Sequence, residues 1–573
     1  MIPSTIHERL AELVEGYGWR DGVGRILNEL SSNERKDLFW EIHLGSQAAW
    51  MLWVGRTHQD TVLNFDAGLG TTTVALSYLF PNVTGAFRDE ASRKCAIARA
   101  RHDGRTIETI HTYGLHEPLP FQGGLFDVIC LPNAQVWLEA EGGTVPKSWE
   151  YFSQLVNLLT PAGMIYLGMR QEPFFSGFGH DFQRLCQLRL GTTMGKNPNR
   201  VLTRLKFYPT SGPVEAVFED RNNRSWIYRC RSTLKKFVKG ESYGLIIGKS
   251  CQDMPSGVIG EIVSQAEIDQ SDRSDIQVYV GTANTLVGNL PGQIVRFPLG
   301  EEPLFRCRNN YETLQALQGK APVAIPAPYD LRRFGDLKYF AESKLPGLEP
   351  TGTRKWPWKC DRMTAQALHS LLQLHTATAQ KVILDDVLFE RLVGASLSHL
   401  MRYCQGTDKE MVAKVEALLK ERLLGKDTVL VRTHGDFKRT NLLVNAAGEV
   451  VGLIDWDLSR DMGFPLMDLL WYLSYEVYLK QRIPFYQAIV RVAFEEDLLM
   501  NDCVQMYWQG LGLGPGDRQE MYAVILLLYQ IHEHLDHWHK SDEDWFSHTM
   551  MPILRSAFEK VLGTVTETKC SVS

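Results

Sequence analysis

Three side chains that carry oxygen ligands occur within one short segment of the second half of the chain. The segment VRTHGDFKRTNLLVNAAGEVVGLIDWD, residues 431–457, contains Asp436, Asn441 and Asp455. Phosphoryl transfer needs a carboxylate that orients an attacking hydroxyl and accepts its proton, and hard oxygen ligands that hold Mg²⁺ against the nucleotide phosphates. We interpret Asp436 as the candidate catalytic base, and Asn441 and Asp455 as candidate Mg²⁺ ligands.

An upstream cation and an upstream carboxylate fit the same chemistry. Arg296 lies in the strand-like QIVRFPL, at the position where kinases place a basic residue against the nucleotide phosphates. Glu312, on the next predicted helix, could pair with Arg296. Asp and Asn also serve as turn and cap residues, so one His-Gly-Asp tripeptide by itself could be a hairpin corner. The order of all five residues favours an ATP- and Mg²⁺-dependent phosphotransferase.

The elements around these residues indicate two lobes. Residues 278–299 are typical of a hairpin of two strands joined by a Gly-Asn-Leu-Pro-Gly turn, and a helix follows at 309–319. From Asp361 onward the pattern is mostly helical, interrupted by the loop and strand pair around 430–460; the helical stretches are 364–380, 409–424 and 484–499. A small β-rich lobe followed by a helical lobe is therefore predicted.

This half of the chain resembles the aminoglycoside phosphotransferase and choline kinase family. The resemblance rests on His434-Gly435-Asp436, Asn441 and Ile454-Asp455-Trp456-Asp457, and it extends over roughly residues 275–560. It implies a bilobal protein-kinase-like fold in which Asp436 is the catalytic base while Asn441 and Asp455 bind Mg²⁺.

Further segments are similar to parts of that family. Gly463, Pro465 and Asp468 resemble the segment that follows the metal-binding residues, and Leu374 with His375 resembles the helix behind the catalytic loop. C-terminal helices of relatives supply acidic groups that receive the substrate. By this resemblance Glu533 and Asp536 are specificity candidates.

The first half of the chain alternates short apolar strands with helical patterns. The strands are expected at 61–66, 82–87 and 126–131, with another ending near 168, and the helices at 71–80 and 90–101. This rhythm predicts a mostly parallel, doubly wound α/β sheet. Strand-like pieces after Leu202, including RLKFYP, SWIYRC and YGLIIGK, could extend that sheet.

A glycine-containing turn follows the first of these strands. In VLNFDAGLGT the residues Asp66, Gly68 and Gly70 lie where backbone amides can approach a nucleotide-like ligand closely. Together with FDVICLPNAQVWLE and LVNLLTPAGMIYLG, this turn resembles the class I S-adenosylmethionine-dependent methyltransferases. The resemblance implies S-adenosylmethionine as a candidate cofactor of Asp66, Gly68 and Gly70.

Two positions depart from that methyltransferase pattern. The family commonly ends its second strand with an acid that binds the ribose hydroxyls, whereas this chain has Phe87 there and Asp89 two residues later. Leu115 stands where relatives often place an Asp near the adenine amine. Active methyl transfer and a fold retained for structure or substrate docking both stay open.

Bulk composition limits the classes of function. A chain of 573 residues favours two to four domains, and 44% hydrophobic with 22% charged residues is typical of a globular protein. The net charge of -6 argues against nucleic acid as a partner. Ten scattered cysteines without a C-x-x-C pair suit a reducing cytosol. An acidic N-terminal segment and the shortness of the most apolar run, 523–529, predict a cytoplasmic protein without a transmembrane segment.

These patterns predict a methyltransferase-like α/β domain at 1–255, a polar linker at 256–274 and a kinase-like domain at 275–565. The predicted activity is phosphoryl transfer from ATP, with Mg²⁺, to a hydroxyl of a small molecule or glycan. One alternative is a bifunctional methyltransferase and kinase of polysaccharide or natural-product biosynthesis. The other is a non-catalytic scaffold that binds nucleotide.

Overall fold

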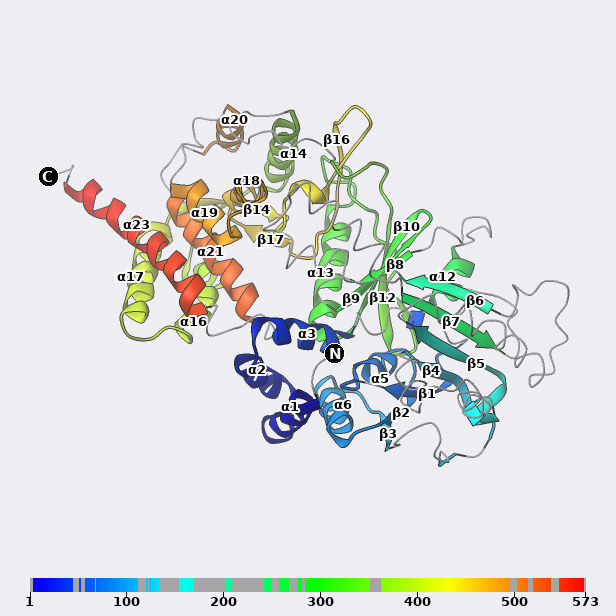
Figure 1. Cartoon of the computed structure of the whole chain (residues 1–573). Helices are drawn as coiled ribbons and strands as arrows, with labels where there is room; N and C mark the ends of the chain where they lie inside the picture. The colour runs from blue at the N-terminus through cyan, green and yellow to red at the C-terminus, as the bar shows by residue number, and fades with distance from the viewer. Residues whose placement is uncertain are drawn as a thin grey trace. The chain divides into compact units, whose positions relative to one another are not determined.

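The computed structural model folds into two compact units (Figure 1). Unit 1 comprises Met1–Leu304 and Asp330–Ala341, and unit 2 comprises Phe305–Tyr329 and Glu342–Ser573. The structure describes residues 4–44, 51–52, 57–66, 68–111, 120–121, 123–132, 154–155, 157–169, 202–207, 242–248, 257–266, 277–280, 284–350, 362–494, 502–513, 519–536 and 546–570. Leu115, the strand-like piece SWIYRC and most of the polar stretch before 277 lie outside these residues.

The first half of unit 1 is organised around a seven-stranded sheet. Its strands are β1 (Thr61–Asp66), β2 (Asn82–Phe87), β3 (Glu108–His111), β4 (Phe126–Leu131), β5 (Leu159–Met169), β6 (Leu202–Phe207) and β7 (Ser242–Gly248). The order is β3-β2-β1-β4-β5-β7-β6; the first five strands are parallel, and β7 is antiparallel to both its neighbours. The predicted strands at 61–66, 82–87 and 126–131 are confirmed, and β6 and β7 extend the sheet.

Helices accompany this sheet in unit 1. They are α1 (Ser4–Tyr17), α2 (Trp19–Glu29), α3 (Ser32–Ile42), α5 (Thr71–Leu76), α6 (Glu90–His102) and α12 (Gly257–Gln265). Helix α6 packs on β2 and β3 and also contacts α1 and α2. Val62 to Phe65 of β1 are all fully or almost fully buried, as expected for a central parallel strand covered on both faces.

Helix α12 lies within the segment predicted to be a linker. Its apolar side chains at 258, 259, 262 and 263 are buried in the core of unit 1. They recur at a spacing that places them on one face of a helix, which the polar residues around them obscured in the sequence. Over residues 257–265 the structure therefore differs from the predicted linker.

A five-stranded sheet completes unit 1. It contains β8 (Gln277–Val280), β9 (Thr285–Leu290), β10 (Gln293–Pro298), β11 (Arg332–Phe334) and β12 (Leu337–Ser343), in the order β11-β12-β10-β9-β8. In it β8–β9, β9–β10 and β11–β12 pair antiparallel. The predicted hairpin is confirmed as β9 and β10, which turn at Gly292 with φ 74°. The segment predicted as the first strand of the hairpin forms two strands, β8 and β9, which pair with each other antiparallel. Asn284, just before β9, has φ 51°.

Both sheets of unit 1 contribute to one hydrophobic core. Leu286, Phe297 and Tyr339 of the five-stranded sheet belong to the same buried cluster as Val62 and Phe80 of the parallel-sheet region. Burial of such apolar surface is the main favourable term in folding, so the shared core explains why these strands form a compact unit with the first half of the chain.

Unit 2 is mostly helical and contains two small sheets. Its elements are the greater part of α13 (Glu301–Leu317), then α14 (Arg362–Thr378), β13 (Gln380–Ile383), α15 (Asp386–Phe389), a π-helical turn (Glu390–Gly394), α16 (Ala395–Met401), α17 (Gly406–Leu423), β14 (Asp427–Thr433), a 3₁₀ turn (Arg439–Asn441), β15 (Leu442–Val444), β16 (Val450–Leu453), β17 (Arg460–Gly463), α18 (Leu466–Gln481), α19 (Phe485–Phe494), α20 (Asp502–Gly510), α21 (Gln519–Asp536), a second π-helical turn (Phe546–Met550) and α23 (Met551–Cys570). The three predicted helical stretches correspond to α14, α17 and α19.

The small sheets of unit 2 hold the loops that carry the candidate residues. One sheet has the order β13-β14-β17, and the other pairs β15 with β16. Phe437, Trp456 and Tyr472 anchor the surrounding core and are completely buried. Within the described part of the chain, no helix combines the length and the apolar character needed to cross a bilayer.

Candidate functional site

The candidate catalytic loop begins where β14 ends. Gly435 has φ 82°, and a Cβ added there would lie 2.0 Å from the carbonyl oxygen of Leu458. A side chain would therefore be excluded both by the left-handed backbone and by the contact itself. This close approach sets the loop that carries Asp436 directly against the loop that carries Asp455.

Asp468, in the first turn of α18, fixes the start of the catalytic loop. Its Oδ2 accepts the backbone N–H of His434 at 2.7 Å, and its Oδ1 accepts that of Gly435 at 2.9 Å. His375 Nε2 lies 3.2 Å from Oδ2, and the same ring contacts the hydroxyl of Tyr507 through Nδ1 at 2.6 Å. The carboxylate is almost completely buried, so these partners compensate its loss of hydration.

His434 has a structural place in this loop. Its Nε2–H donates to the carbonyl oxygen of Ile454 at 3.0 Å, and its Nδ1 accepts the backbone N–H of Asp436 at 3.3 Å. These roles match a neutral imidazole protonated on Nε2. Burial lowers the pKa of His434 below its ordinary value, although the carboxylates of Asp468 and Asp436 oppose this shift. His434 therefore ties the strand end to the second loop without carrying charge at neutral pH.

Asp436 lies at the centre of a compact polar group. Its Oδ2 contacts Lys438 Nζ at 2.5 Å and accepts from Asn441 Nδ2 at 3.1 Å. The same amide donates to the backbone oxygen of Asp436 at 3.0 Å. Asp436 Oδ1 is buried and has no hydrogen-bond partner among the described residues. The predicted base thus has one oxygen held in place and the other available to a further donor.

Lys438 is a site residue that the sequence interpretation missed. Burial by itself lowers the pKa of Lys438, but the Asp436 carboxylate more than offsets this and holds the pKa above its ordinary value. The charge of Asp455 acts in the same direction. A lysine two residues after the predicted base, on the same loop, was the available signal, because a short loop must place these two side chains near each other.

An ion pair holds the next residue of the loop. Arg439 makes two hydrogen bonds to Glu476 of α18, from Nε at 3.0 Å and from a terminal nitrogen at 2.9 Å. Both side chains are largely buried, at 13% and 4% exposure. A two-pronged arginine–carboxylate contact fixes orientation as well as distance. The loop between Asp436 and Asn441 is therefore attached to α18 at both of its ends, through Asp468 and through Glu476.

Asp455 lies in the second loop, between β16 and β17. Its φ of 71° is in the left-handed region, which non-glycine residues rarely adopt and which is common at functional sites. The backbone N–H of Ile454 donates to the backbone carbonyl oxygen of Asn441 at 3.0 Å, which joins this loop to the first. The charge of Asp455 opposes the lowering of the His434 pKa and adds to the raising of the Lys438 pKa, so its carboxylate lies near the same group.

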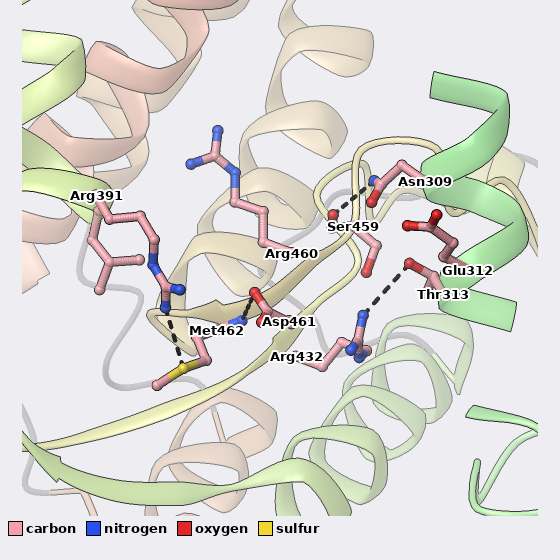
Figure 2. A pocket seen from close by; sticks show the side chains of 10 residues that line it. Asn309, Glu312, Thr313, Arg391, Arg432, Ser459, Arg460, Asp461 and Met462 are labelled. Atoms are coloured by element: carbon pink, nitrogen blue, oxygen red, sulfur yellow. Dashed lines mark hydrogen bonds between the residues drawn. The ribbon is translucent and has the colours of Figure 1, made fainter. Parts of the chain in front are cut away.

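Two asparagines of α13 hold the second loop in place. Asn310 Oδ1 accepts the backbone N–H of Trp456 at 3.0 Å, and its amide donates to the buried Glu342 at 2.7 Å. Asn309 Nδ2 donates to the carbonyl oxygens of Asp457 at 2.9 Å and Ser459 at 2.8 Å. The bond to Ser459 is drawn in Figure 2. These bonds couple the position of α13 to the backbone around Asp455.

The donor set of these loops fits a divalent cation such as Mg²⁺. Asn441 and Asp455 offer an amide and a carboxylate oxygen, which are ligand types that Mg²⁺ prefers. The amide nitrogen of Asn441 is used by Asp436, which leaves its Oδ1 as the acceptor for another group.

A family model described as the phosphotransferase enzyme family (APH) matches residues 266–499, which include all of these loops. The C-terminal half of the chain contains an APH-family domain. The family resemblance predicted for this half is thereby confirmed over residues 266–499. The methyltransferase resemblance of the first half remains a prediction.

Solved structures of low identity are similar to part of the chain. An aminoglycoside phosphotransferase, APH(3'')-Id from Streptomyces rimosus, is 11% identical, with 47% of this chain and 97% of that one covered and a TM-score of 0.31. A choline/ethanolamine kinase family protein from Mesorhizobium loti is 15% identical, with 52% and 95% covered and a TM-score of 0.35. No curated protein matches the chain by sequence.

The remaining predicted residues of the phosphotransferase site lie on two elements. Arg296 is in β10 of unit 1, where it pairs in register with Val287 of β9. Glu312 is on α13 in unit 2 and lines a cavity there with Arg432. The predicted pairing of Arg296 with Glu312 stays a prediction. Glu533 of α21, a specificity candidate, accepts from Arg306 of α13 at 2.9 Å.

In unit 1 the predicted cofactor-binding turn follows β1. Asp66 is the last residue of β1 and pairs in register with Phe87 at the end of β2. Gly70 has φ 78°, and a Cβ added there would lie 2.1 Å from Cβ of Ala96 and 3.2 Å from the ring of Phe87. Around Gly68 the space is more open, with Oε1 of Glu41 at 3.1 Å from the added Cβ. Gly70 is thus required by apolar packing of α6 and Phe87 against the turn.

The acid that follows β2 has a structural partner. Asp89 caps α6, accepting the backbone N–H of Ser92 at 2.7 Å and its hydroxyl at 2.8 Å. An N-cap carboxylate satisfies otherwise unpaired amides and interacts favourably with the helix dipole. Phe87, two residues earlier, is completely buried. At the end of β2 this chain therefore has an aromatic core residue followed by a helix cap.

Proposed function

We propose that the APH-family domain transfers the γ-phosphoryl group of ATP, with Mg²⁺, to a hydroxyl of a small molecule or glycan. The proposal rests on the hydrogen bonding of the two carboxylate oxygens of Asp436. One carboxylate oxygen is fixed by Lys438 and Asn441, while the other is buried without a hydrogen-bond partner among the described residues. A buried carboxylate oxygen that receives no hydrogen bond is costly in free energy. The substrate hydroxyl would remove this cost by donating a hydrogen bond to it.

In the proposed reaction Asp436 Oδ1 accepts the hydrogen bond of the substrate hydroxyl and then its proton. A bond forms between the hydroxyl oxygen and the γ-phosphorus, the bond between that phosphorus and the bridging β,γ-oxygen breaks, and ADP leaves. Lys438 stabilises the ionised carboxylate before the transfer and provides positive charge beside the phosphoryl group. Because positioning and electrostatics supply most of the catalysis in this chemistry, the hydrogen bonds that fix the loop matter directly.

Asn441 and Asp455 are the proposed Mg²⁺ ligands. Bound Mg²⁺ neutralises charge that develops on the nucleotide phosphates. Asn441 is held by Asp436, and the backbone at Asp455 is held through Ile454 and Trp456, so both oxygens are positioned before the nucleotide binds. Arg296 is proposed to contact the phosphates, and Glu312 to orient it.

The deciding experiment measures nucleotide binding and turnover on the same preparations. Calorimetric titration with ATP, with and without Mg²⁺, is made on wild type, Asp455→Ala and Asp436→Asn. A panel of sugars, amino alcohols and short glycans then serves as acceptors, with ADP release as the readout. We expect Mg²⁺-dependent ATP binding that is lost in Asp455→Ala and kept in Asp436→Asn, with turnover lost in both.

Two results would contradict this proposal. Absence of ATP binding in wild type would reject it and favour a scaffold without a nucleotide. ATP binding that is equally tight with EDTA and in Asp455→Ala would favour a nucleotide-binding scaffold without metal-assisted transfer. Asp427→Asn is the matched control, because this carboxylate is exposed at the start of the same strand, β14.

A second candidate function concerns unit 1. The strand order places the topological switch point between β1 and β4, and Asp66 with the Gly70 turn lies at the carboxyl end of β1. Open α/β sheets bind ligands at this position, which favours a nucleotide-like ligand such as S-adenosylmethionine and hence a bifunctional enzyme. Titration with S-adenosylmethionine tests this: binding that is lost in Asp66→Ala supports it, and no binding leaves unit 1 with a structural or docking role.

A further inference from the structure

Unit 2 also contains a cavity whose wall does not include the polar group around Asp436. Its volume is about 390 Å³, within the range of small-molecule sites. Its walls come from α13, from the π-helical turn that starts at Glu390, from β14 and from β17 with the residue before it (Figure 2). Asp436, Asn441 and Asp455 are not among the residues that line it.

Three arginines from three different elements line this cavity. They are Arg391 of the π-helical turn, Arg432 of β14 and Arg460 of β17. Arg391 and Arg460 also act together on Tyr529: burial raises the pKa of that phenol, and both guanidinium groups oppose the shift. Three cations have thus been brought to one concave surface by segments that are separated by up to about seventy residues.

None of these arginines forms an ion pair with a described residue. Arg391 donates to the sulfur of Met462 at 3.2 Å, a weak acceptor, and Arg432 reaches the hydroxyl of Thr313 only at 3.5 Å. Arg460 lies over the ring of Tyr529 at 4.0 Å. Some other arginines of unit 2 do have carboxylate partners, as Arg439 has in Glu476.

The charge of the cavity is not balanced by its own acids. Glu312 and Asp461 line it as well, so the described residues of its wall include three positive and two negative side chains. Burial lowers the pKa of Arg432 from its ordinary value, and Asp461 offsets this only in part. A desolvated guanidinium without a carboxylate gains strongly from an anion, and its planar fork suits the oxygens of phosphate.

Two neutral polar side chains of the wall are already used by the protein. Ser459 donates its hydroxyl to the backbone oxygen of Thr433 at 2.8 Å, and the amide of Asn309 donates to two carbonyl oxygens. Recognition in this cavity therefore falls to the arginines. We propose that Arg391, Arg432 and Arg460 form a second anion site in the APH-family domain, which binds the phosphate group of a phosphorylated small molecule.

Inorganic phosphate is the probe for the test, with sulfate as a second tetrahedral anion and acetate as a control at equal ionic strength. Binding to the full chain is measured by equilibrium dialysis in EDTA, without nucleotide. We expect about one phosphate per chain, with an affinity reduced about tenfold or more in Arg432→Gln and in Arg460→Gln, since each removes a charge-assisted contact. Arg422→Gln is the matched control, because it removes the same charge from an exposed position on α17.

Two further variants separate binding from damage to the fold. Asp461→Asn removes an exposed acid from the cavity wall and is expected to tighten phosphate binding several-fold, an effect that a merely destabilised protein would not produce. Asp455→Ala is expected to leave phosphate binding unchanged, so the proposed anion site and the proposed phosphotransferase site can fail separately. Phosphate binding that survives both arginine substitutions, or that weakens as much in Arg422→Gln, would overturn the proposal. Loss of binding only in Asp455→Ala would overturn it too, since phosphate would then be bound at the nucleotide site.

Discussion

Two glycine turns, one in each unit, have nearly the same backbone but very different surroundings. Gly435 and Gly70 both follow a strand, at φ 82° and 78°, and in both cases an added Cβ would meet another atom at about 2 Å. At Gly435 that atom is the backbone oxygen of Leu458, and the side chains of Asp468, His434 and Asp436 around the turn are buried and hydrogen-bonded. At Gly70 the neighbours are Ala96 and Phe87, which are apolar and completely buried.

The difference shows what a glycine turn can and cannot indicate. A turn of this type reports that the backbone must pass close to another segment, but the chemistry depends on the side chains that surround it. Around Gly435 several costly buried charges are retained and each has partners, which is expected where function requires them. Around Gly70 the same backbone geometry is stabilised by core packing, and the nearby acid Asp89 serves as a helix cap.

The largest effect should come from removing the proposed base. Asp436→Asn keeps the shape of the side chain but removes the proton acceptor, so we expect kcat to fall by about a thousandfold. The equivalent change in unit 1, Asp66→Asn, should leave this rate within about twofold. Steady-state ADP release with an acceptor found in the hydroxyl panel measures both. A fall of less than about tenfold in Asp436→Asn would show that another group accepts the proton.

Alanine in place of each glycine should destabilise both turns to a similar extent while affecting function at only one. The left-handed backbone costs about 1–2 kcal/mol for a residue with a Cβ, and the overpacking adds about 1–3 kcal/mol. Thermal and urea unfolding of Gly435→Ala and Gly70→Ala should therefore both show losses of about 2–5 kcal/mol. Only Gly435→Ala should also reduce Mg²⁺-ATP turnover in the folded fraction.

Matched controls for these substitutions exist in each unit. Gly448 in unit 2 and Gly104 in unit 1 also have positive φ, at 75° and 64°, but an added Cβ meets no atom of a described residue within 4 Å. Gly448→Ala and Gly104→Ala should lose only the backbone part, about 1–2 kcal/mol. If they lost as much as Gly435→Ala and Gly70→Ala, the close contacts would not be the cause.

Lys438 distinguishes the two turns further, since its ammonium group contacts the proposed base. We expect Lys438→Gln to lower kcat by about ten- to a hundredfold, because Asp436 then loses a charged partner worth about 1.5–3 kcal/mol. Lys438→Arg should recover part of the rate. As a control, Arg93→Gln in unit 1 breaks a surface pair with Glu90 and should change neither rate nor stability measurably. A rate in Lys438→Gln equal to wild type would assign this lysine a structural role.

Much of the fold and part of the site could be predicted from local pattern. The alternation of short, largely apolar strands with helical patterns predicted β1, β2 and β4 at their correct bounds, and the spacing of Asp436 and Asn441 indicated side chains that the structure brings to 3.1 Å. These features depend on neighbours in sequence, such as the alternation of strand and helix or the length of one loop. Such local signals are the most reliable ones that a single sequence contains.

The features that were missed depend on contacts between distant segments. The segment that contains α12 is polar in sequence, but four apolar residues of the helix are buried in a core formed with strands distant in sequence. Arg391, Arg432 and Arg460 line the same cavity, but their spacing in the sequence follows no rule that would predict this. The use of Asp89 as a cap rather than as a ligand also becomes visible only with the geometry of α6.

The smallest effect should be a difference in pH dependence between the units. Burial lowers the folded-state pKa of His434, so its neutral form contributes stability that is present above pH 6.5 and is lost as pH falls toward the lowered value. In unit 1 burial lowers the pKa of His7, but Glu41 more than compensates and raises it. That contribution is present below pH 6.5 and is lost as pH rises through the raised value.

Replacing each histidine by Gln should therefore change the stability curve in opposite directions. The free energy of unfolding is measured without Mg²⁺ between pH 5 and 8. Below pH 6.5 its slope against pH should be less positive in His434→Gln than in wild type, by up to about 1.4 kcal/mol per pH unit, which corresponds to one proton. The slope of His7→Gln should instead become more positive just above pH 6.5. Slopes that change in the same direction in both variants would mean that the two histidines respond to a shared electrostatic background rather than to their own partners. The contrast between a neutral buried ring and an ion-paired one would then have to be abandoned.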